Sequence, residues 1–113
     1  MYYIRKRLEV AGSHHLQLNY ESPCQRLHGH NWIITIYCKA PTLDENGMVI
    51  DFKVIKQKIH SVLDHQNLNE ILPFNPTAEN IARWVVEQVP HCYRADIQES
   101  EGNTATYEVE DYR

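Results

Sequence analysis

The sequence predicts an α+β fold in which one four-stranded antiparallel sheet carries two helices on one face. Near both ends of the chain every second residue is apolar, as in strands that bury one face, whereas in the middle the apolar residues lie three or four apart, as in helices. The connections within the two outer strand pairs are short enough to join antiparallel neighbours. The 113 residues suit one domain and no repeat or linker divides them, so we treat residues 1–113 as a single domain.

The first two strands are predicted over residues 2–10 and 31–39, on either side of a loop that contains Pro23. Both show the alternation of a strand, and the second is rich in the β-branched side chains that favour strands. The inward-facing residues are Tyr2, Ile4, Leu8 and Val10 in the first strand and Trp32, Ile34, Ile36 and Cys38 in the second.

Two helices are predicted between the strand pairs. Asp51 is well placed to cap the first helix, which ends near Leu63. Either Asn75 or Thr77 caps the second helix, and Pro90 ends it. The apolar residues at helical spacing are Ile55, Ile59 and Val62 in the first helix and Ile81, Val85 and Val89 in the second.

The last two strands are predicted over residues 93–100 and 104–112, with a turn between them. The element order is therefore ββααββ, and one face of the sheet has no helices. That face carries apolar residues such as Ile33 and Tyr37. Because an uncovered and partly apolar sheet face tends to find a partner, we expect a homo-oligomer.

The composition excludes several classes of function. The formal net charge is −4 and no basic stripe stands out, which argues against a nucleic-acid partner. No apolar run is long enough to cross a membrane and the N-terminus has no apolar signal core, so we expect a cytoplasmic protein with no membrane partner. The three cysteines show no CxxC spacing, and reduced thiols suit that compartment.

Histidines are the most unusual feature of the composition. If the alternation of the first strand continues to His14, this residue faces the same side as His28 and His30 of the second strand. Residues i and i+2 of an extended segment project to one side, about 6 to 7 Å apart, so the HGH sequence can present two imidazoles to one ion. Three neutral imidazoles match a catalytic zinc site with one open position. The alternative is that these histidines are ordinary polar residues of a turn and of a strand start.

Four other residues are candidates for chemistry. Cys24 lies in a polar loop close to the proposed cation, whose field would lower the pKa of the thiol. Asp64 and His65 follow the first helix and form either a plain helix-terminal loop or, if folding brings them to Cys24, a proton-transfer pair. Glu99 falls on the inward face of its strand, where it is either exposed by fraying or paired with a donor-rich ligand.

The order of the motifs HHL, CQRLHGHNW, GMVIDF, LDHQNLN, NPTAEN and QES resembles the 6-pyruvoyl-tetrahydropterin synthase and QueD family over essentially the whole chain. The resemblance implies the tunnelling fold, in which ββααββ subunits join their sheets into a barrel and the active sites lie between subunits. It also implies a homo-oligomer, which we expect to be a hexamer or a tetramer.

The resemblance assigns a role to each candidate. The three histidines would bind Zn²⁺, and Cys24 would be the catalytic thiol. Asp64 and His65 would complete the proton-transfer group. Glu99 would hold the amino and ring N–H groups of a pterin, and Thr77 would lie at the pterin edge.

The gap between Cys24 and the HGH sequence indicates which reaction to expect. Three residues separate them, which is typical of QueD-like members, whereas members that make the 6-pyruvoyl product have a longer gap. We therefore expect 6-carboxy-5,6,7,8-tetrahydropterin synthase activity, which converts 7,8-dihydroneopterin triphosphate to the 6-carboxy product, acetaldehyde and triphosphate on the route to queuosine. The alternatives are a 6-pyruvoyl-tetrahydropterin synthase, another pterin side-chain lyase of this fold, and a non-catalytic zinc-binding assembly module.

Overall fold

The computed structural model describes residues 1–110 of the chain. The strands are β1 (Tyr2–His14), β2 (His28–Ala40), β3 (Gln66–Asn67), β4 (Cys92–Ser100) and β5 (Asn103–Glu108). The helices are α1 (Phe52–Leu63), α2 (Leu68–Ile71) and α3 (Ala78–Gln88), and a 3-10 turn, η1, spans Pro23–Gln25.

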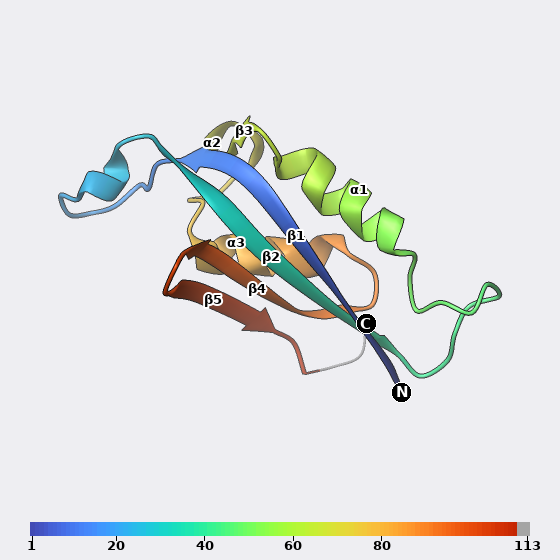
Figure 1. Cartoon of the computed structure of the whole chain (residues 1–113). Helices are drawn as coiled ribbons and strands as arrows, with labels where there is room; N and C mark the ends of the chain where they lie inside the picture. Colours follow the sequence, from blue (N-terminus) through green and yellow to red (C-terminus); the bar gives the residue numbers. More distant parts are fainter. Residues whose placement is uncertain (111–113) are drawn as a thin grey trace.

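The strands form one sheet in the order β3-β1-β2-β4-β5. β1 and β2 pair along their whole length, from Tyr2 opposite Ala40 to His14 opposite His28. β4 and β5 extend the sheet with antiparallel pairing, and only β3 is parallel to its neighbour, β1. Helices α1 and α3 lie on one face of this sheet and leave the other face without helices (Figure 1).

The predicted fold class is confirmed, and the structure adds one strand and one short helix. The expected sheet had four strands, whereas the two-residue strand β3 makes a fifth. The four-residue helix α2 follows directly. Neither element was predicted, because so few residues do not display a strand or helix period.

The inward faces of the sheet and helices form a single apolar core. Its most deeply buried large side chains include Trp32, Ile34, Ile36, Ile55, Ile59, Leu63, Ile81, Val85 and Ile97. Two predicted core residues are wrong: Tyr2, at the beginning of β1, is 51% exposed, and Val62 is 40% exposed. Leu63 is buried instead of Val62, because it lies four residues after Ile59 and so stays on the helix face that packs against the sheet.

Side-chain caps fix where the helices begin. Asp51 caps α1 as predicted, since its carboxylate accepts the backbone N–H two residues on at 2.8 Å, and this helix ends at Leu63. Of the two candidates for α3, Thr77 is the cap, because its hydroxyl accepts the backbone N–H three residues on at 3.1 Å. The amide of Asn75 instead bonds to both backbone groups of Gln17, at 2.9 and 3.1 Å. These bonds hold the loop after β1 against the start of α3.

The two N-terminal strands are longer than predicted, and this extension positions the site. β1 continues past its predicted end to His14, and β2 begins at His28 instead of Asn31. β5 is shorter than the predicted 104–112 and ends at Glu108; the last two residues of that range lie outside the described part of the chain.

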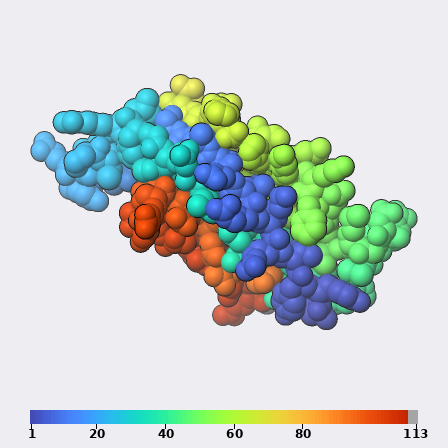
Figure 2. Space-filling model, viewed as in Figure 1, coloured from blue at the N-terminus to red at the C-terminus, as the bar shows by residue number. Residues whose placement is uncertain are grey.

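The molecule is elongated, with principal extents of 51 × 27 × 26 Å. The loop at residues 15–27 and the loop at residues 41–51 project at opposite ends (Figures 1 and 2). No helix among residues 1–110 is long and apolar enough to span a membrane. The extended ends of β1 and β2 lie where the loop at 15–27 begins and ends.

Candidate active site

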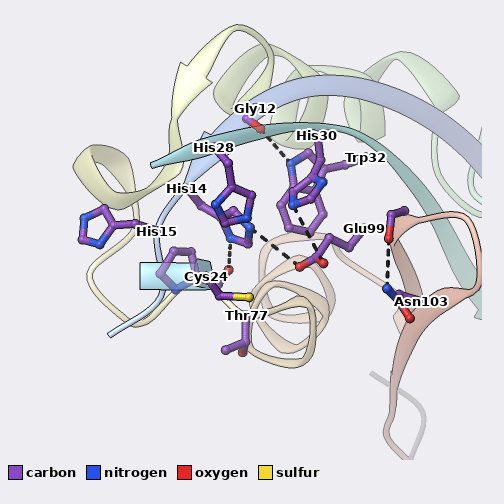
Figure 3. A network of polar contacts seen from close by, with 12 residues as sticks. Gly12, His14, His15, Cys24, His28, His30, Trp32, Thr77, Glu99 and Asn103 are labelled. Atoms are coloured by element: carbon purple, nitrogen blue, oxygen red, sulfur yellow. Dashed lines mark hydrogen bonds and ion pairs between the residues drawn. The ribbon is translucent and has the colours of Figure 1, made fainter. Parts of the chain in front are cut away.

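Three histidines converge where the β1–β2 pair ends. His14 and His28 are cross-strand partners, and His30 lies two residues further along β2, on the same face of the strand. One ring nitrogen from each lies within 4.8 Å of the others, so the three rings could hold a metal ion (Figure 3). The shared face that strand alternation predicts for these residues is therefore confirmed.

Backbone carbonyls determine which ring nitrogen of two histidines carries the proton. Nδ1 of His14 lies 2.8 Å from the Pro76 carbonyl oxygen, and Nδ1 of His28 lies 2.6 Å from the Arg26 carbonyl oxygen. A carbonyl only accepts, so each Nδ1 is the donor. In this tautomer the Nε2 atom of each ring faces away from the carbonyl and carries the lone pair that a metal would bind, which is the arrangement by which outer hydrogen bonds orient histidine ligands.

The electrostatics of this cluster also suit a cation. Nε2 of His14 and Nε2 of His30 are buried and have no hydrogen-bond partner among residues 1–110. Burial, more than any other cause, lowers the pKa of both rings, which keeps them neutral near pH 7. Buried polar atoms without partners are costly, and a metal ion would satisfy both nitrogens at once.

Trp32 supports the histidines in a way that the sequence did not reveal. Its ring packs edge-on against His14 and His30, with centroids 4.9 and 5.2 Å apart. Its Nε1–H donates to the Gly12 carbonyl oxygen at 3.1 Å. A Cβ at Gly12 would lie 3.4 Å from both Leu68 and the indole nitrogen, which is van der Waals contact, so the backbone of β1 packs directly against these two side chains. One feature of the sequence indicates this role: Trp32 comes two residues after His30 and so lies on the same face of the strand.

Glu99 of β4 points inward, as its position in the alternation predicts. Its two carboxylate oxygens lie 3.7 Å from Nε2 of His14 and 3.8 Å from Nε2 of His30, and its side chain is 25% exposed (Figure 3). A cavity of about 440 Å³ opens beside it. The cavity walls are formed by Leu16, Leu18, Tyr20, Thr77, Ala78, Glu79, Glu99 and residues 102–105. The structure therefore brings Glu99 and Thr77 to one cavity next to the histidines.

Cys24 lies on η1, in the loop that leads into β2. It is exposed and is not part of a disulfide. Its carbonyl oxygen accepts the backbone N–H of Leu16 at 2.7 Å, and Ser22 and Gln25 cap the turn reciprocally. In the view of Figure 3 its side chain lies below the histidines, between His28 and Thr77.

Asp64 and His65 lie along the edge of β1 that faces away from β2. One carboxylate oxygen of Asp64 accepts the Ala11 backbone N–H at 2.9 Å, and this bond is the main reason why its pKa is lowered. The other oxygen lies 3.5 Å from His65 and 3.6 Å from His60, a neighbour that the sequence did not suggest. His65 has a positive φ of 60° and an 82% exposed side chain.

One chain does not assemble the whole predicted set of catalytic residues. Among residues 1–110, neither Asp64 nor His65 bonds to Cys24 or to the three clustered histidines. His65 lines a second cavity of about 450 Å³, which His30 of the cluster also lines, together with Ser13 and Asn31. These two residues alternate with His14 and His30 along their strands, so their side chains point to the opposite face of the sheet.

Similarities to known proteins identify the family. The family described as 6-pyruvoyl tetrahydropterin synthase matches residues 3–110. A 6-carboxy-5,6,7,8-tetrahydropterin synthase of Synechocystis sp. is 32% identical over 121 residues, which cover 95% of this chain and 93% of that protein. A dihydroneopterin monophosphate aldolase of Pyrococcus furiosus is 35% identical over 77 residues, which cover 66% of this chain and 65% of that protein.

A solved structure agrees with the fold. The 6-pyruvoyl tetrahydropterin synthase of Caenorhabditis elegans superposes with a TM-score of 0.77 at 22% sequence identity, covering 96% of both chains. Fold, family match and sequence relatives thus point to the same conclusion. The chain belongs to the 6-pyruvoyl tetrahydropterin synthase family and has its tunnelling fold.

Proposed function

We propose that this protein is a zinc-dependent 6-carboxy-5,6,7,8-tetrahydropterin synthase. It would convert 7,8-dihydroneopterin triphosphate to 6-carboxy-5,6,7,8-tetrahydropterin, acetaldehyde and triphosphate, as a step in queuosine biosynthesis. The observation that carries the proposal is the cluster of three histidines, two with buried and unpartnered nitrogens, beside a cavity that contains Glu99 and Thr77. The relative from Synechocystis sp. and the three-residue gap after Cys24 support the choice of product.

The three imidazoles would hold Zn²⁺, which when bound supplies a Lewis acid that acidifies the substrate side chain. Cys24 would act as the base that removes a proton from that side chain. Glu99 would accept the N–H groups of the pterin ring, and Thr77 would contact its edge. The apolar wall of the cavity, at Leu16 and Leu18, suits a flat heterocycle.

Asp64 and His65 would complete the site from a second copy of the chain. They do not contact Cys24 within one chain, and the helix-free sheet face gives copies a surface on which to associate. The described lining of the 440 Å³ cavity contains no Lys or Arg, so the cations that a triphosphate needs would also come from outside this lining. We expect a hexamer or a tetramer in the cytoplasm, where the Cys24 thiol would stay reduced.

Another reaction on the same substrate class is the second candidate. The relative from Pyrococcus furiosus is named as an aldolase of dihydroneopterin monophosphate, which favours a lyase that cleaves the side chain to leave a hydroxymethylpterin. A non-catalytic zinc-binding assembly module is a weaker candidate, because it would need neither Cys24 nor the Asp64–His65 pair.

Mass spectrometry of the pterin product would test the proposal. The zinc-loaded protein is incubated with 7,8-dihydroneopterin triphosphate, and we expect the 6-carboxy product together with acetaldehyde. A 6-pyruvoyl or a hydroxymethyl product would assign the protein to one of the other reactions. Absence of turnover, with one Zn²⁺ bound per chain, would favour the binding module.

A further inference from the structure

We propose that Glu99 is the fourth ligand of the metal in the substrate-free protein, and that it leaves the metal when a pterin fills the adjacent cavity. The inference rests on the proposed zinc site and adds to it. It gives Glu99 two successive partners, first the metal and then the ring N–H groups of the substrate.

The first argument is the spacing of the polar atoms. In a tetrahedral zinc site with bonds of about 2.0 to 2.1 Å, neighbouring ligand atoms lie about 3.3 to 3.4 Å apart. One oxygen of Glu99, Oε2, lies 3.7 Å from Nε2 of His14, and the other, Oε1, lies 3.8 Å from Nε2 of His30. The nitrogens of the three rings lie up to 4.8 Å from one another. These distances exceed the tetrahedral spacing by about 0.3 to 0.5 Å for the carboxylate oxygens and by up to about 1.5 Å for the ring nitrogens, so the rings and the carboxylate would close inward around a bound ion.

The second argument is the chemistry of the facing atoms. Nδ1 of His14 donates to the Pro76 carbonyl, so Nε2 of the neutral ring presents a lone pair. The carboxylate of Glu99 also presents only lone pairs, and two acceptors that face each other need a cation between them. A shared proton would draw the atoms to about 2.7 to 2.9 Å. The observed 3.7 Å is longer, and it suits a metal ion with a bond to each side.

The third argument is the lack of a competing carboxylate at the cluster. Among residues 1–110, Glu99 is the acidic residue that lies within 4 Å of the ring nitrogens of His14 and His30. Asp64 bonds to the backbone of β1 and approaches other histidines. Cys24 is the remaining candidate for the fourth position, and it is exposed on η1.

Glu99 lies between the histidine cluster and the cavity, so its carboxylate can also bind a pterin ring in the cavity. The same residue lines the 440 Å³ cavity and keeps 25% of its side chain exposed. A carboxylate that accepts N–H groups from a ring inside the cavity must turn away from the histidines. Substrate binding would therefore open the fourth coordination position, and the metal would stay covered when the cavity is empty.

Metal affinity tests the resting contact without any turnover. Zn²⁺ affinity is measured by competition with a chromogenic chelator for the wild type, Glu99→Gln and Glu101→Gln. Glu101 is exposed in the turn two residues further on, so Glu101→Gln removes the same charge without removing a ligand. We expect Glu99→Gln to weaken binding at least about tenfold, in the range seen when groups around a metal site are removed, and Glu101→Gln to leave it unchanged. Equal affinities for all three proteins would overturn the inference.

The spectrum of the Co²⁺-substituted protein tests the exchange of partners. Neopterin, the unphosphorylated pterin, is added as the probe. We expect it to change the visible ligand-field bands of the wild type, whereas the bands of Glu99→Ala should already differ without neopterin and respond little to it. A sulfur-to-cobalt charge-transfer band in the wild type that Cys24→Ala abolishes would show that Cys24 is the fourth ligand, and the inference would be wrong.

These outcomes are separate from those that decide the proposed function. If Glu99→Gln binds Zn²⁺ like the wild type while the wild type makes the 6-carboxy product, the fourth ligand is wrong and the function stands. If the wild type and His28→Ala bind Zn²⁺ equally weakly, the zinc site itself fails. Circular dichroism of each variant confirms that it is folded before these comparisons are made.

Discussion

Replacing Trp32 by phenylalanine tests how far the packing beneath the histidines determines the metal site. The indole is 1% exposed, donates to the Gly12 carbonyl oxygen and packs against the rings of His14 and His30. Phenylalanine keeps an aromatic ring on the same strand face but removes the N–H donor and part of the ring volume. The substitution therefore disturbs the support of the site and leaves every proposed ligand in place.

The expected loss of stability can be worked from two contributions. Loss of the buried hydrogen bond costs about 1 kcal/mol. The indole is larger than the phenyl ring by about 40 Å³, and at about 24 cal/mol per Å³ of residual cavity this adds about 1 kcal/mol. We expect the free energy of unfolding to fall by about 2 kcal/mol. Zn²⁺ affinity should fall too, because the two rings lose the surface that orients them.

Urea denaturation at a fixed protein concentration measures the first effect, and chelator competition measures the second. Trp84→Phe is the matched control, because Trp84 is a half-buried residue of α3 at the margin of the core. We expect that control to cost less stability and to leave Zn²⁺ affinity unchanged. If Trp32→Phe kept wild-type stability and affinity, the reasoning that Trp32 positions the histidines would be refuted.

Three further predictions concern the site and its surroundings. Cys24→Ala should keep one Zn²⁺ per chain and lose turnover, whereas His28→Ala should lose both; full activity of Cys24→Ala would contradict its role as the base. Burial lowers the pKa of His14 and His30 in the folded protein, so at a pH below the usual value of 6.5 the unfolded chain binds more protons than the folded one. The free energy of unfolding of the metal-free protein should therefore decrease as the pH drops below 6.5. Urea denaturation across that pH range measures this effect. Thr77→Ala should destabilise the fold by about 1 kcal/mol through loss of the α3 cap, and Thr77→Ser, which keeps the hydroxyl, should not; equal losses in the two variants would argue against the cap.

Local patterns in the sequence were sufficient to predict the main elements and the histidine cluster. Alternation along a strand fixes which face each side chain takes, so His14, His28 and His30 could be placed on one side from their positions alone. Cap residues acted locally as well: Asp51 starts α1 because its carboxylate reaches a backbone N–H two residues away. These features depend on neighbours within a few residues, which the sequence states directly.

Features that depend on distant residues were missed or left open. Helix position 62 was predicted to be buried, but the direction of α1 across the sheet turned Leu63 inward instead. The two-residue strand β3 exists because it pairs with β1, more than fifty residues earlier in the chain. The support that Trp32 gives to the histidine rings likewise requires packing that no periodicity displays.

The sequence by itself thus determined the fold class, the face shared by the histidines and, through its motifs, the family. Only the tertiary structure decided what surrounds that cluster. It placed the carboxylate of Glu99 within 4 Å of two ring nitrogens, and it bonded Asp64 to the backbone of β1 and paired it with His60 and His65 rather than with Cys24. The physical reason is that side-chain direction follows from the local backbone period. The distance between side chains on different strands follows from sheet register and helix packing, which are set by the whole core.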